Sequence, residues 1–125
     1  MATFFTRVEL HGIHHNSEAY GLLHIEMQNR SFLQSVSYAS GWLKLPPAEY
    51  YRTAAGLTKE IVLADAKAAA TEATKSVPLV FGKKHKYAIL VVQTNDYASF
   101  GLEPREGSST HNAEMNRLIR STARR

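Results

Sequence analysis

The stretch that decides the fold begins at Thr3 and ends at Leu10, and its sequence is TFFTRVEL. Its even-numbered positions are aromatic, β-branched or aliphatic, and its odd-numbered positions include Arg7 and Glu9. A period of two with aromatic and β-branched residues predicts a β-strand with one buried face. Gly12 follows closely and marks the end of this strand.

Hydrophobic spacing outward from this strand predicts two helices and three further strands. A helix over 17–29 is indicated by apolar residues three or four positions apart, after a capping residue at Asn16 or Ser17. A second helix over 58–75 is indicated by Thr58 as its cap and by a stripe of alanines. Strands are predicted at 32–38, at 42–53 with an interruption at Pro46-Pro47, and at 87–94.

The order strand, helix, strand, strand, helix, strand is that of the split βαβ unit. We therefore predict an α+β fold of the ferredoxin-like type, βαββαβ, with an antiparallel four-stranded sheet and two helices on one face. The strands at 3–10 and 87–94 are the most apolar, so we place them at the centre, the latter covered on both faces. The domain is expected to span residues 1–98, and residues 99–125 to form a basic, flexible tail.

Composition narrows the class of protein. The chain has 125 residues, a formal net charge of +4 and no cysteine, which excludes a disulfide scaffold and a thiol nucleophile. Its longest wholly apolar run, 87–92, is far shorter than the roughly 20 residues that span a bilayer, and the N-terminus lacks a signal-peptide pattern. We expect a cytoplasmic protein, off the membrane, whose mildly basic charge allows a polyanionic partner.

Three histidines, His11, His14 and His15, lie within five residues between the first strand and the first helix. Histidine exchanges protons near neutral pH, as RNA cleavage by internal attack of a 2′-hydroxyl requires. Three imidazoles also suit a transition metal, although no carboxylate stands at a diagnostic spacing. The third interpretation is a solvated polar loop without chemistry.

Cations form the second candidate feature. Three lysines surround His85 just before the last predicted strand: Lys83, Lys84 and Lys86. Four arginines of the tail add further positive charge: Arg117, Arg120, Arg124 and Arg125. The rings of Tyr38, Trp42, Tyr50 and Tyr51 either stack on the bases of a single-stranded nucleic acid or pack in the core or a dimer interface.

Arg30, at the end of the first predicted helix, either stabilises the helix dipole or holds a phosphate. Several other chemistries lack their motif. The chain has no phosphate-cradling glycine loop, no G-x-S-x-G and only two aspartates, so neither a cofactor nor a two-metal carboxylate site is expected.

Four segments carry a family resemblance: MATFFTRVELHG at 1–12, MQNRSF at 27–32, LPPAEY at 45–50 and KYAILV at 86–91. Over residues 1–95 the chain resembles small phage- and plasmid-borne bacterial proteins grouped with the GhoS endoribonuclease antitoxins. The resemblance implies a ferredoxin-like fold, akin to the small nucleases of CRISPR adaptation, and metal-independent cleavage of a toxin's message. It also implies a role for an arginine near the first helix, for which Arg30 is the nearest match. The CRISPR nucleases place an aspartate after the first strand, where this chain has His11.

Two hypotheses follow. In the first, the chain is an RNA-binding protein or endoribonuclease of the antitoxin type, with His11, His14 or His15 transferring protons and Arg30 clamping a phosphate. In the second, it is a non-catalytic binding module of a phage or mobile element that inhibits a host nucleic-acid-processing complex. In either case we expect a homodimer, because ferredoxin-like domains with an exposed edge strand often pair.

Overall fold

The computed structural model describes residues 2–38, 41–94 and 96–104. Over these residues the structure is a small α+β fold with two helices and five strands. Their order is β1 (Ala2–Leu10), α1 (Glu18–Asn29), β2 (Ser35–Tyr38), β3 (Gly41–Lys44), β4 (Glu49–Ala54), α2 (Lys59–Ala73) and β5 (Tyr87–Gln93). The α+β class predicted from the sequence is confirmed.

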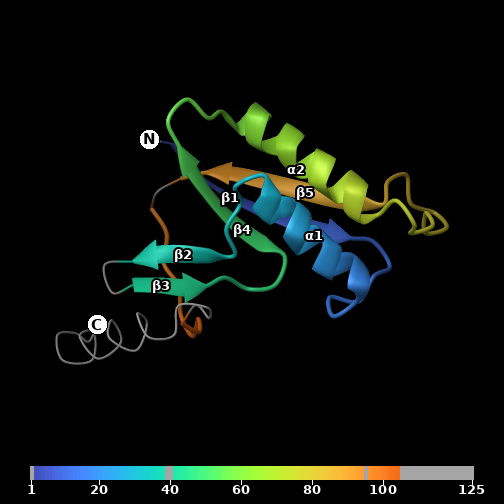
Figure 1. The fold of residues 1–125 in the computed structure, drawn as a ribbon, viewed down its shortest axis with the longest axis horizontal. Coiled ribbons are helices and arrows are strands. Elements are labelled where there is room, and N and C mark those ends of the chain that lie inside the picture. The colour runs from blue at the N-terminus through green and yellow to red at the C-terminus, as the bar shows by residue number, and fades with distance from the viewer. Residues whose placement is uncertain (1, 39–40, 95, 105–125) are drawn as a thin grey trace.

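β1 is the centre of the main sheet. It pairs antiparallel with β4 on one side and with β5 on the other, which gives the order β4-β1-β5. Both helices lie on the same face of this sheet, where α1 packs against α2 and α2 lies over β1 and β5 (Figure 1). Neither α1 nor α2 covers the other face of the sheet.

The core forms between the sheet and the two helices. Phe4, Val8 and Leu10 of β1 are buried there, as the alternation along the strand predicts. They meet Leu23 of α1 and a row of buried alanines on α2, whose small side chains let the helix lie close to the sheet. Each large apolar side chain buried in this way stabilises the fold by about 1.5–3 kcal/mol.

The two helix caps differ. Thr58 accepts a hydrogen bond from the backbone N–H of Ile61, at 3.2 Å, so the cap predicted for α2 is confirmed. Ser17 stands at the N-cap of α1 but makes no capping bond, and its hydroxyl is buried without a partner among the described residues. The position of that cap was predicted, but its hydrogen bond was not found.

The middle of the chain departs from the predicted four-stranded sheet. β2 and β3 form a separate two-stranded sheet, and the chain then turns at Pro46 and Pro47 and at Ala48, whose φ is +65°. Prolines cannot donate to a sheet, so β3 and β4 are two strands rather than one interrupted strand. Among the described residues, the outer edge of β4 pairs only through an isolated bridge between Leu33 and Tyr51, closed by backbone hydrogen bonds of 2.8 and 2.7 Å.

The central position predicted for the strand at 87–94 is wrong. β5 has one strand neighbour, β1, and stands at the edge of the main sheet of the described residues. Its side chains are not covered on both faces, because Leu90 is 62% exposed and Val92 is 43% exposed. An apolar run is therefore present at an edge, where sequence reasoning expected a core.

Residues 96–104 continue past the predicted domain boundary at 98. The backbone N–H of Lys44 donates to the carbonyl of Glu103 at 2.7 Å, and Leu43 bridges to Pro104. This segment therefore lies against β3, while the rest of the predicted tail is outside the described residues. Among the described residues, no helix is long and apolar enough to cross a membrane.

Candidate nucleic-acid interface

The histidine segment His11–His15 begins where β1 ends. Gly12 turns the chain there with a φ of +74°, which glycine adopts without strain. A Cβ added to Gly12 would lie 2.5 Å from Cγ2 of Val80, so the loop between α2 and β5 packs directly on this turn. The position of the histidines is thus fixed by contact with a distant part of the sequence.

The lysine segment Lys83–Lys86 lies beside the histidine segment, because β1 and β5 are antiparallel neighbours. The backbone N–H of His11 donates to the carbonyl of Lys86 at 2.9 Å. The His11 ring reaches the carbonyl of His85, also at 2.9 Å. Two segments that lie far apart in the sequence thus form one end of the molecule, which we call the cationic end.

Hydrogen bonds at the cationic end set the proton positions on two rings. A carbonyl only accepts, so Nδ1 of His11 donates to His85 and Nε2 is the bare nitrogen of the neutral ring. That Nε2 lies 3.9 Å from the carboxylate of Glu9, and the His11 side chain is 14% exposed. Nδ1 of His14 instead accepts from the backbone N–H of Asn16 at 3.2 Å, which leaves the proton on its Nε2. The neutral ring of His11 therefore offers a base at Nε2, whereas His14 offers an acid only as the imidazolium.

His15 completes the segment. Its ring stacks on the His14 ring, with centroids 4.6 Å apart and an interplanar angle of 22°. Both residues are exposed to solvent. His15 also lines a hollow of about 390 Å³ together with Arg7, Glu9 and Tyr20.

Arg7 is a cation that the sequence analysis did not single out. It points outward from β1, is 72% exposed on its side chain, and stands 3.8 Å from Glu49. The same alternation that identified the buried face of β1 places Arg7 on the open face, and this was the signal available in the sequence. Only the structure shows that Arg7 shares a hollow with His15.

The predicted lysines are exposed or half-buried. Lys83 and Lys84 are exposed, and neither side chain has an ion-pair or hydrogen-bond partner among the described residues. Nζ of Lys86 donates to the carbonyl of Thr74 at the end of α2, at 3.1 Å. The four arginines predicted to extend this surface, Arg117, Arg120, Arg124 and Arg125, lie outside the described residues.

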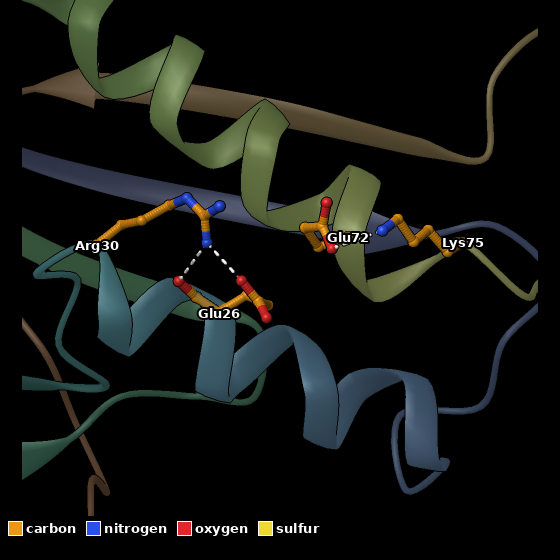
Figure 2. Close-up of polar contacts among 4 residues, drawn as sticks. All are labelled: Glu26, Arg30, Glu72 and Lys75. Atoms are coloured by element: carbon orange, nitrogen blue, oxygen red, sulfur yellow. Dashed lines mark hydrogen bonds and ion pairs between the residues drawn. The ribbon is translucent and has the colours of Figure 1, made fainter.

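Arg30 is not at the cationic end. It follows the last turn of α1, and its Nη1 donates to Glu26 twice, to the carbonyl at 3.0 Å and to the carboxylate at 2.6 Å (Figure 2). The histidine segment precedes the other end of α1, about 20 Å away at the rise of an α-helix. The constellation of Arg30 with the histidines, expected from the sequence, does not form in this structure.

Another histidine, His24, was not identified from the sequence as a functional residue. Its Nδ1 lies 2.6 Å from the hydroxyl of Tyr50, and this bond joins α1 to β4. Burial lowers the pKa of His24, which favours the neutral form of the ring. Burial and the neighbouring Tyr20 raise the pKa of Tyr50. A half-buried helical histidine gives no pattern in sequence, because its partner is brought to it only by the fold.

The aromatic rings divide between core and surface. Tyr50 has no exposed area, so it cannot stack on a nucleic-acid base. Trp42 and Tyr51 are half-buried and lie edge to face with centroids 6.2 Å apart. The Tyr38 side chain lies outside the part of the structure that is described.

Two further findings concern metal binding and similarity to known proteins. In the described part of the chain, no group of three or more histidine, aspartate or glutamate side chains is placed to hold a metal ion. Comparison with family models, with curated proteins and with solved structures gives no match to this chain. The function is therefore argued from the residues of the site itself.

Proposed function

We propose that this chain is a cytoplasmic, ferredoxin-like RNA-binding protein of the GhoS antitoxin type that cleaves RNA without a metal. The fold part rests on β4-β1-β5, which matches three strands of a βαββαβ sheet in order and direction. The bridge between Leu33 and Tyr51 lies on the outer side of β4, where the strand predicted at 32–38 would pair to complete a four-stranded sheet. In this interpretation, that bridge is what remains of the fourth strand of the sheet.

The observation that carries the function is the cationic end. It joins lysines, which attract phosphates, to histidines, which exchange protons, through two contacts of His11 with the lysine segment. RNA supplies both partners, because its phosphodiesters are anions and its 2′-hydroxyl is an internal nucleophile. The resemblance to endoribonuclease antitoxins points to the same class of substrate.

Proton transfer by His11 and His14 can support RNA cleavage that needs no metal. Nε2 of His11 takes the proton of the 2′-hydroxyl, whose oxygen attacks the adjacent phosphorus. For the second proton transfer His14 acts as the imidazolium: it gives its Nε2 proton to the leaving 5′-oxygen and returns to the neutral ring that accepts from Asn16. The products are a 2′,3′-cyclic phosphate and a 5′-hydroxyl. The charge that builds on the phosphorane is stabilised by a nearby cation, for which Arg7 is better placed than Arg30.

The test of cleavage uses labelled single-stranded RNA with and without EDTA. We expect cleavage that survives EDTA, is lost in the His14→Ala/His15→Ala variant and persists in a Gln28→Ala/Asn29→Ala control. The control residues are exposed like the histidines but stand at the other end of α1. RNA that stays intact in every lane would contradict the catalytic part of the proposal.

The test of binding is separate and uses charge reversal. Lys83→Glu/Lys84→Glu should weaken RNA binding and reduce its salt dependence, since two phosphate contacts are removed. Lys59→Glu/Lys67→Glu makes the same change in charge on exposed residues of α2 and should have a smaller effect. If RNA is neither cleaved nor bound, the second hypothesis, a module that inhibits a host nucleic-acid-processing complex, takes its place.

A further inference from the structure

A cationic pocket lies beside the histidine segment, between the end of α2 and the loop that leads into β5. It has a volume of about 450 Å³ and is lined by Lys75, Lys84, Lys86 and His85, with Thr71, Thr74, Leu79 and Tyr87 completing the wall. None of these eight lining residues is acidic. The volume is in the range of pockets that hold small ligands, roughly 300–1,000 Å³.

Internal contacts fix the wall of this pocket. The Tyr87 hydroxyl pairs with Oγ1 of Thr71 at 2.9 Å, which ties β5 to α2. The buried Thr74 hydroxyl donates to the carbonyl of Ala70 at 2.7 Å and is used within the helix. These hydroxyls hold the shape of the pocket, and the lysines supply its charge.

The lysines are only partly used by the protein. Lys86 donates one of its three N–H groups to the carbonyl of Thr74, which leaves two for a ligand. Lys75, just past the end of α2, pairs with Glu72 of the helix at 3.1 Å (Figure 2). Lys84 is exposed, and its side chain makes no hydrogen bond or ion pair with the described residues. The negative end of the α2 dipole accounts for Lys86, but it does not account for Lys84.

We propose that this pocket binds a phosphate monoester, the group at the end of an RNA chain or of a free nucleotide. A monoester carries about −1.5 to −2 charges and three terminal oxygens, whereas each phosphodiester within a chain carries about −1. Several ammonium groups around one hollow therefore favour the monoester over the diester. The inference extends the proposed function, because it names which part of the RNA the lysines hold.

The first experiment follows the amide NMR signals of the full chain during titration with inorganic phosphate and then with adenosine 5′-monophosphate. We expect saturable shifts at Lys84, Lys86 and Tyr87, lost in Lys84→Gln and kept in a Lys59→Gln control. Shifts that never saturate, or that Lys84→Gln leaves unchanged, would overturn the inference. Thr71→Val offers a second variant, which keeps the charge but loosens the Tyr87 wall and should weaken the same shifts.

The second experiment identifies the source of the phosphate. The affinity for one RNA sequence is measured twice, once with a phosphate at its end and once with a hydroxyl there. The His14→Ala/His15→Ala variant is used so that the RNA is not cleaved during the measurement. Binding roughly tenfold tighter with the phosphate indicates an RNA end, at the strength of charge-assisted hydrogen bonds. Pocket shifts with the mononucleotide but equal binding of the two RNAs indicate a free nucleotide.

The two proposals fail in different ways. A chain that binds hydroxyl-ended RNA but gives no phosphate response at Lys84 would overturn the pocket and leave the RNA function standing. A chain that binds the mononucleotide through Lys84 but ignores RNA would support the pocket and overturn the proposed function.

Discussion

The burial of His24 makes stability depend on pH. Burial lowers the pKa of His24 in the folded chain, so below about pH 6.5 the unfolded state binds more protons than the folded state. Stability is therefore full above the unfolded pKa and falls as the pH drops toward the folded pKa. We expect urea unfolding to show a lower free energy at about pH 5 than at about pH 7.5.

Two variants separate this ring from other titrating groups. His24→Gln should flatten the dependence on pH, while His14→Ala, at an exposed ring, should leave it nearly unchanged. Tyr50→Phe should cost about 1–2 kcal/mol at neutral pH, because it leaves the His24 nitrogen without its partner. An unchanged pH profile in His24→Gln would show that another group causes it.

Arg7 and Arg30 are the second residue-scale comparison. Arg7 shares a hollow with His15, whereas Arg30 is bound to Glu26 at the far end of α1. We therefore expect Arg7→Ala to lower the rate of RNA cleavage at least tenfold, about 1.4 kcal/mol of transition-state stabilisation, and Arg30→Ala to have little effect. Single-turnover cleavage measures both, and the reverse order would return the phosphate clamp to Arg30.

At the scale of elements, the contact between the two loops of the cationic end predicts an unusually sensitive glycine. Gly12→Ala requires a residue with a side chain at positive φ and also a contact with Val80, so we expect a loss of about 1–3 kcal/mol. Gly56→Ala provides the control, because its φ is also positive, at +79°, but nothing lies within 4 Å of the added Cβ. The difference between the two variants in urea unfolding isolates the contact with Val80.

The same contact offers a rescue. Val80→Ala should recover part of the stability lost in Gly12→Ala, and part of the RNA cleavage if the loop contact positions the histidines. If the two glycine variants are equally destabilised, the loops do not press on each other at Gly12.

Elements differ in how far their sequence determines them. β1, α1, α2 and β5 begin and end close to the predicted residues, because each has a strong period or, in α2, a cap that forms. The segment from Leu33 to Ala54 was harder, since short strands choose partners by tertiary packing and prolines only mark a break. The same holds for the candidate site. Its histidines and lysines could be identified from the sequence, but the contact between them depends on the fold, as do the contacts of Arg7 and His24.

At the scale of the whole molecule, β5 is the feature that a single copy leaves unfinished. It is seven residues long and apolar, and in the described structure its outer edge has no strand partner. Such an edge tends to pair with another strand unless charge, proline or a bulge protects it, and β5 contains no charged residue and no proline. An apolar run in the sequence does not distinguish a strand at the centre of a sheet from an edge strand that pairs with a second copy of the chain.

The homodimer expected from the sequence stays a prediction, and β5 gives it a geometry. Antiparallel pairing of two β5 strands about Leu90 sets Leu90 against its copy and Ala88 against Val92, a row of exposed apolar side chains that is complementary to itself. It also sets Lys86 opposite Thr94, two residues from the exposed Asp96 of the second copy, so opposite charges meet at both ends. We expect the chain to sediment as a dimer and Leu90→Lys to sediment as a monomer, because two ammonium groups would meet on the axis. Leu22→Lys, at a 45% exposed leucine of α1, should stay dimeric, and a wild-type chain that remains monomeric at high concentration would contradict the pairing.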